Sequence, residues 1–231
     1  MPMRTEREVL ARAGRQLRAL YRTTAHRLYI DPSQEREIIS AFERTHVESA
    51  VDFMWMGSPM VTSPLDLWIY QEIVHETSPD LIITTSQNCG YLATLCQLRG
   101  TGEVLCVGVG QAKPTGEQAR LRTVPEPMTS AETRALMEEH ARSKRRVLVV
   151  VGSSHRRHPV LDELRLYGSV VTTGSYLIVE DTRSGLDRAH GRAEAVEEFL
   201  RTDPSFVVDG AKEKFYLSDN QGGYLRRSSP R

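Results

Sequence analysis

Apolar positions along the chain follow two spacings, short runs rich in β-branched residues and longer stretches with helical periodicity. Short apolar runs bounded by turn residues are typical of buried strands, and recurrence every three to four residues is typical of helices. The runs predicted as strands are 81–83, 104–109, 147–151, 176–179, 206–208 and 215–217. The stretches predicted as helices are 64–73, about 91–98, 130–143, 159–167 and 193–200, of which the first opens at Ser63-Pro64.

Strands that alternate with helices predict an α/β fold with a mostly parallel sheet covered on both faces. No helix separates the last two predicted strands, so we expect an antiparallel C-terminal hairpin at the sheet edge. Residues 1–50 are polar and helical in pattern, and we expect an N-terminal helical segment there and the main domain over 51–231. Ligands bind such sheets beyond the carboxyl ends of the strands, which selects the loops 84–90, 108–113, 152–158 and 180–192.

Composition narrows the classes of function. The 231 residues include 30 Lys+Arg and 30 Asp+Glu, and this zero formal charge argues against a nucleic-acid partner. No apolar run approaches the roughly 18–20 residues that span a bilayer, so no membrane contact is expected. Three cysteines, an odd number in a chain of this length, favour a reducing compartment, and we expect a cytoplasmic protein.

Several segments of the main domain together resemble one family. The segments are WMGSP at 55–59, SPLDLWIYQE at 63–72, His155, His158, Tyr167, GSYLIVEDT at 174–182, EKF at 213–215 and NQGGYLRR at 220–227. In order and spacing they are similar to the cephalosporin hydroxylase family, Rossmann-like proteins related to rhamnosyl and macrocin O-methyltransferases. The resemblance covers roughly residues 50–227.

The resemblance implies a Rossmann-like methyltransferase fold and a role in tailoring a small-molecule natural product, such as an antibiotic. Members of the family typically bind S-adenosylmethionine (SAM) and Mg²⁺ and methylate hydroxyl groups. Oligomers are common among them and some need partner proteins. For this chain we therefore expect a small-molecule substrate, a homo-oligomer and, as an option, a partner enzyme.

The SAM-binding motifs of the family are altered in this chain. The first binding loop of the family resembles Glu-Thr-Gly-Thr-x-x-Gly-Gly-Ser, whereas residues 84–92 read TTSQNCGYL and keep only Thr85 and Gly90, with Ser86 at the first glycine. An acidic residue that accepts hydrogen bonds from the ribose is replaced by Gly110, and a Gly-Ser-Ser near the adenine aligns with 126–128, which read EPM. The resemblance thus places a degenerate SAM site at Thr85, Ser86, Gly90 and Gly110.

The family motif Asp-Ser-Asp-His, in which the first Asp ligates the metal and the His acts as general base, reads Gly152-Ser153-Ser154-His155 here. A histidine of ordinary pKa near 6.5 suits proton transfer at neutral pH, so we predict His155 as the catalytic base. The alternative is a helix-entry histidine that bonds only to backbone groups.

The two other metal-ligand positions of the family are kept as Glu180 and Asp181. Mg²⁺ prefers oxygen ligands and keeps several waters, so two carboxylates could hold a weakly bound ion. The alternative for this pair is hydrogen bonding to the loop 182–192. Trp55, Trp68 and Tyr70 are expected to pack the N-terminal segment against the sheet.

These changes suggest that the chain has left methyl transfer. Our leading hypothesis is a base-assisted elimination, isomerisation or cyclisation without SAM or any other cofactor. The first alternative is an O-methyltransferase that uses SAM and Mg²⁺ on an antibiotic or sugar hydroxyl. The second is a noncatalytic partner of another biosynthetic enzyme.

Overall fold

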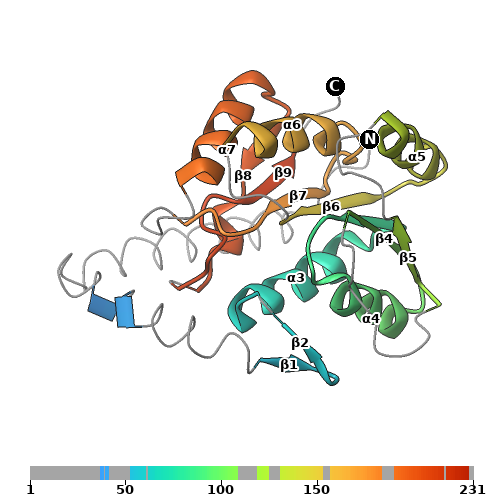
Figure 1. Cartoon of the computed structure of the whole chain (residues 1–231), viewed down its shortest axis with the longest axis horizontal. Coiled ribbons are helices and arrows are strands. Elements are labelled where there is room, and N and C mark those ends of the chain that lie inside the picture. Colours follow the sequence, from blue (N-terminus) through green and yellow to red (C-terminus); the bar gives the residue numbers. More distant parts are fainter. Residues whose placement is uncertain are drawn as a thin grey trace, which may run out of the picture. The chain divides into compact units, whose positions relative to one another are not determined.

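The structure is a computed structural model that describes residues 37–38, 40–41, 53–60, 62–108, 119–124, 131–152, 157–183, 190–215 and 217–228. The chain divides into two compact units, Met1–Glu48 and Ser49–Arg231. The predicted N-terminal helical segment, residues 1–50, lies almost wholly outside the described residues. Every labelled element belongs to the second unit (Figure 1).

The second unit is built from strands that alternate with helices, as predicted. The strands are β1 (Met54–Trp55), β2 (Ser58–Pro59), β3 (Leu81–Thr84), β4 (Glu103–Val107), β5 (Leu121–Val124), β6 (Val147–Val151), β7 (Tyr176–Val179), β8 (Phe206–Val208) and β9 (Tyr224–Arg227). The helices are α3 (Pro64–Thr77), α4 (Cys89–Arg99), α5 (Ala131–Arg142), α6 (Arg157–Gly168), α7 (His190–Thr202) and the short 3₁₀ helix η1 (Gly210–Lys212). The opening of α3 is as expected, with Ser63 as N-cap and Pro64 in the first turn.

Seven strands form one sheet in the order β5-β4-β3-β6-β7-β9-β8, while β1 and β2 pair separately as an antiparallel hairpin. Strands β3 to β7 are parallel, and β9 runs antiparallel to both β7 and β8. The prediction of a mostly parallel sheet with antiparallel C-terminal strands is confirmed. The chain builds outward from β3 to β5 and then returns to β6 on the other side of β3, so the topological switch point lies between β3 and β6.

Alternate residues of each central strand face opposite layers of helices. Leu81 and Ile83 pack with α5, α6 and α7, whereas Ile82 packs with α3 and α4. Both faces of the sheet are therefore covered, with α3 and α4 below it and α5, α6 and α7 above it in Figure 1. None of the helices in the described ranges is long and apolar enough to cross a membrane.

Two details of the sheet differ from the prediction. The partner of β8 is β9 at 224–227, not the run 215–217, which follows η1 without forming a strand among its described residues. The strand β5 was not predicted because its central residues Arg122 and Thr123 are exposed, and an edge strand needs no continuous apolar run.

Candidate functional site

The site lies at the switch point, where the carboxyl ends of β3, β6 and β7 meet. Thr85, directly after β3, donates its backbone N–H to Val150 O at 3.0 Å and accepts from Gly152 N on its side-chain oxygen at 3.1 Å. Glu180, directly after β7, donates its N–H to Val151 O at 2.9 Å. These bonds fix three strand ends against one another.

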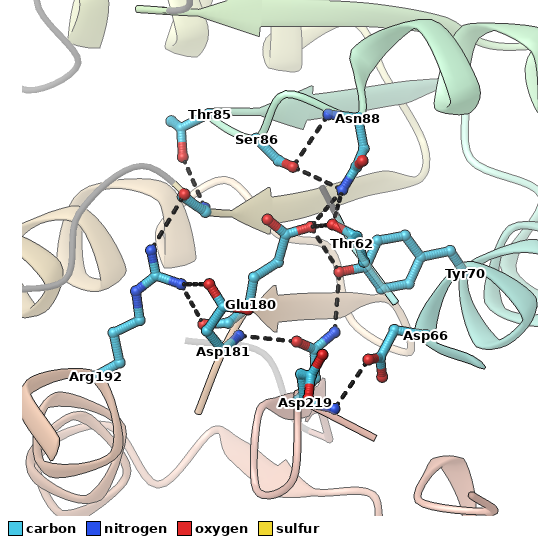
Figure 2. Close-up of polar contacts among 12 residues, drawn as sticks. Thr62, Asp66, Tyr70, Thr85, Ser86, Asn88, Glu180, Asp181, Arg192 and Asp219 are labelled. Atoms are coloured by element: carbon cyan, nitrogen blue, oxygen red, sulfur yellow. Dashed lines mark hydrogen bonds and ion pairs between the residues drawn. The ribbon is translucent and has the colours of Figure 1, made fainter. Parts of the chain in front are cut away.

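The Glu180 side chain points into the protein and is only 6% exposed. Its Oε1 accepts hydrogen bonds from Tyr70 OH of α3 at 2.8 Å and from Asn88 Nδ2 at 2.8 Å, with Thr62 Oγ1 at 3.4 Å (Figure 2). Asn88 is in turn held by Ser86, because the backbone N–H and the Nδ2 of Asn88 both donate to Ser86 Oγ. We refer to Thr62, Tyr70, Ser86, Asn88 and Glu180 as the Glu180 cluster.

Burial raises the pKa of Glu180 from 4.5 to about 7, and the nearby negative charge of Asp181 acts in the same direction. Hydrogen bonds from Tyr70 and Ser86 and the positive charge of Arg192 oppose the shift. The carboxyl group therefore changes protonation near neutral pH, at a place where neutral donors hold its position.

Gly152 leaves the space that the Glu180 carboxylate fills. A Cβ atom at position 152 would lie 2.0 Å from Glu180 Oε2 and 3.1 Å from Ser86 Cβ. Any side chain here would displace the carboxylate. Glu180 can therefore take its inward position only because Gly152 stands where the family has a metal-ligating Asp.

Asp181 lies on the other side of this strand end. Its backbone has φ +52°, and its N–H donates to Asn220 Oδ1 at 2.9 Å. Its Oδ2 accepts from Arg192 Nη1 of α7 at 2.7 Å. Bonding to residue 192 is the alternative that we gave for this carboxylate.

A second buried carboxylate, Asp66 of α3, holds the C-terminal loop. Its Oδ1 accepts from Ser218 Oγ at 2.5 Å and Tyr224 OH at 2.7 Å, and its Oδ2 accepts from Asp219 N at 2.9 Å. Asn220 joins this group to the Glu180 cluster, because its Nδ2 donates to Tyr70 OH at 3.0 Å. We refer to Asp66, Ser218, Asp219 and Tyr224 as the Asp66 cluster.

The structure brings four of the predicted site residues together, namely Thr85, Ser86, Glu180 and Asp181. Gly90 lies next to them in the first turn of α4. Gly110 and His155 lie outside the described residues, so their roles stay predictions, as do the cofactor and metal roles of the others. No group of three or more His, Cys, Asp or Glu side chains that could hold a metal ion occurs within the described ranges.

Sequence reasoning missed Thr62, Tyr70, Asn88, Arg192 and Asn220. We expected Tyr70 to pack as an aromatic residue, and it is fully buried, but its hydroxyl serves the site. Trp68, expected to pack as well, is 58% exposed. Tyr70 and Asn220 both lie in segments that carry the family resemblance, so polar residues in those segments were the available signal.

Solved structures of similar fold include two of CmcI. The structure of CmcI with Mg-SAM has a TM-score of 0.61 and 15% identity, and the match covers 78% of each chain. The structure of CmcI with SAH has a TM-score of 0.54 and 15% identity, and it covers 76% of this chain and 81% of that one. At this identity the likeness shows the fold.

Sequence comparison gives more than the fold. The rhamnosyl O-methyltransferase of Mycobacterium leprae (strain TN) is 29% identical over an alignment of 191 residues, and the match covers 75% of this chain and 82% of that protein. The family model Rhamnosyl O-methyltransferase/CmcI matches residues 48–228.

Our expectation that the chain uses no cofactor is wrong. The family is one of methyltransferases, and the neighbours of like fold contain Mg-SAM and SAH. The leading hypothesis of a SAM-independent elimination has no support, and the O-methyltransferase alternative fits better. The expected homo-oligomer, partner enzyme and cytoplasmic location stay predictions. Since the family model spans nearly all of the second unit, the chain belongs to the Rhamnosyl O-methyltransferase/CmcI family.

Proposed function

We propose that the chain is a SAM-dependent O-methyltransferase that acts on a hydroxyl group of a sugar or other small-molecule natural product. The observation that carries this proposal is the family match over residues 48–228, which includes every strand end of the site. Glu180 and Asp181 lie at the carboxyl end of β7, next to the switch point where such sheets bind ligands.

The residues around α4 fit a SAM molecule. The N-cap Asn88 makes no side-chain capping bond, which leaves the first-turn N–H groups of α4 to an anionic group such as the SAM carboxylate. Asn88 Oδ1 is buried and has no hydrogen-bond partner within the described part of the chain, so it suits a donor such as the SAM amino group. Gly90 and Gly108, the latter with φ +70°, let the backbone come close to a ligand at the ends of β3 and β4.

The Glu180 cluster positions this loop. Glu180 accepts a hydrogen bond from Asn88, which is the N-cap of α4. The carboxylate thereby fixes the residue that offers its side-chain oxygen, and the start of the helix, to SAM. Tyr70 holds Glu180 from the opposite side. Glu180 is therefore a positioning residue in this proposal.

When bound, SAM supplies a methyl group on its sulfonium sulfur, which passes to the substrate oxygen and leaves S-adenosylhomocysteine. The hydroxyl proton needs an acceptor in this step. His155, three residues beyond Gly152, is the proposed acceptor, because a neutral imidazole takes up a proton readily near pH 7.

The described residues do not fit Mg²⁺ between Glu180 and Asp181. Position 152 carries no carboxylate, the Glu180 carboxylate fills its space, and Asp181 is paired with a guanidinium. Mg²⁺ needs open oxygen ligands and room for its waters. The proposed reaction therefore contains no step through a metal.

The test is methyl transfer and SAM binding by the purified full-length chain. We expect calorimetry to show SAM bound with a Kd in the micromolar range, about −8 kcal/mol. We also expect mass spectrometry to show S-adenosylhomocysteine and a methyl ether when hydroxyl compounds, beginning with methyl rhamnosides, are supplied.

The matched variants are Gly90→Val and Gln97→Ala, at the two ends of α4. Gly90→Val should abolish SAM binding by crowding the loop, and the exposed Gln97 should tolerate alanine without change. A folded wild-type chain that binds no SAM, or a Gly90→Val variant that binds it unchanged, would refute the proposed function.

A further inference from the structure

Arg192 is a buried cation that bonds to the ends of β6 and β7. Its side chain is 1% exposed, although α7 begins only two residues earlier. Nη1 donates to Glu180 O and to Asp181 Oδ2, each at 2.7 Å, and Nη2 donates to Gly152 O at 3.2 Å. Figure 2 shows the guanidinium on the side of Asp181 away from Tyr70.

The oxygens around this guanidinium are those that a hard metal ion would select. Two are backbone carbonyls at the ends of β6 and β7, and the third is a carboxylate. Carbonyl and carboxylate oxygens are the usual protein ligands of Ca²⁺ and Mg²⁺. A guanidinium binds the same groups through directed N–H bonds and cannot lose its charge in a protein.

The absence of a side chain at 152 and the presence of Arg192 compensate each other in charge. The resemblance implies three carboxylates around a divalent ion, whereas this chain has two carboxylates near one guanidinium. With Glu180 ionised, this site has one negative and one positive charge fewer than the family's site, so the net charge is the same. The buried member of the pair is Arg192, whose side chain is 1% exposed against 45% for Asp181. An unpaired buried cation would be costly, and the ion pair with Asp181 lowers that cost.

We propose that Arg192 takes the place of the divalent cation in this chain, so that the strand ends of the site are held by a guanidinium and no Mg²⁺ is bound there. This inference rests on the proposed function, since it describes how the same site is organised for methyl transfer. Arg192 acts as a positioning residue that joins β6 to β7.

The test measures binding of Mn²⁺, a paramagnetic substitute for Mg²⁺, by electron paramagnetic resonance on the full-length chain. We expect the wild type to bind Mn²⁺ with a Kd no tighter than about 1 mM. The double variant Gly152→Asp/Arg192→Met restores three carboxylates and removes the cation, and it should bind Mn²⁺ at least about 10-fold more tightly.

Arg192→Met alone should lower the melting temperature, and the matched variant Arg201→Met, at the exposed end of α7, should not. The inference is overturned if the wild type binds Mn²⁺ with a Kd below about 1 mM. It is also overturned if Arg192→Met is as stable as Arg201→Met, or if a folded double variant gains no binding.

Calorimetry with SAM in the presence of EDTA separates the two proposals. SAM binding without metal supports both. A chain that binds SAM and also binds Mn²⁺ with a Kd below about 1 mM refutes only the role of Arg192. A chain that binds no SAM, either with EDTA or with added Mg²⁺, refutes the proposed function, whatever the Mn²⁺ result.

Discussion

Two of the buried acidic residues, Asp66 and Glu180, differ in what surrounds them. Both Asp66 oxygens accept hydrogen bonds, from two hydroxyls and one backbone N–H of the segment 218–224. Glu180 accepts from Tyr70 and Asn88 on Oε1, and its Oε2 points toward the bare Cα of Gly152 at the switch point. The Asp66 carboxylate has hydrogen-bond partners on both oxygens, and the Glu180 carboxylate lies where a ligand would bind.

Burial raises the pKa of both groups, so desolvation does not distinguish them. The two carboxyl groups are distinguished by their places in the topology. Asp66 joins a helix to a C-terminal loop, whereas Glu180 lies at the carboxyl end of a parallel strand. Asn220 connects them through Tyr70, so a change in one cluster can be tested for its effect on the other. A buried carboxylate indicates function when its position, and not only its pKa, points to a ligand.

The largest effect is expected on stability, from Asp66→Ala. The variant leaves Ser218, Tyr224 and the Asp219 N–H without their acceptor, and we expect the free energy of unfolding to fall by about 4 kcal/mol. Urea unfolding measures it. The control Asp162→Ala removes an exposed carboxylate and should change stability by less than about 0.5 kcal/mol. Equal losses in the two variants would show that the Asp66 cluster has no special structural role.

The next effect is expected on activity, from Glu180→Ala. Without this acceptor Asn88 and the start of α4 shift, and a displacement of about 1 Å can cost about 100-fold in rate, so we expect kcat/KM for methyl transfer to fall by that factor. Asp66→Asn, which keeps an acceptor for the C-terminal loop, should retain most of the activity of the folded enzyme. An equal loss of activity in Asp66→Asn would erase the distinction between the clusters.

The smallest effect is expected on the pH dependence of stability, and it concerns Glu180 and not Asp66. The pKa of Glu180 is about 7 in the folded protein against an ordinary 4.5, so the folded state binds the proton more tightly. Its contribution to stability is complete below about pH 4.5 and is lost as pH rises through about 7. Glu180→Gln does not titrate, so relative to the wild type it should gain about 2 kcal/mol between pH 5 and pH 8.

This experiment compares urea unfolding of Glu180→Gln and wild type at several pH values. The titration of Asp66 is common to both proteins and cancels in the difference. Parallel stability curves across this range would mean that Glu180 does not titrate near neutral pH.

Local pattern was sufficient for most of the elements. The apolar runs at 81–83, 147–151 and 176–179 became central strands, and Ser63-Pro64 opened α3 as predicted. It failed for the edge strand β5, which is half polar, and for β9 at 224–227, which pairs with both β7 and β8. An edge strand needs burial on fewer sides, so its sequence carries a weaker signal. For β9, the order of strands in the sheet, and not the local pattern, decides which run pairs with β8.

The sequence by itself determined the fold class, the family and the candidate carboxylates at 180 and 181, because these depend on local periodicity and motif order. Only the tertiary structure decided that Glu180 turns inward to Tyr70 and Asn88, 110 and 92 residues away, and that Arg192 meets Asp181. Side-chain spacing along a strand is fixed by local geometry, but which strand ends meet depends on the order of strands in the sheet. A glycine at 152 reads as a lost ligand in the sequence and as the space for a carboxylate in the structure, because only the fold brings position 180 beside it.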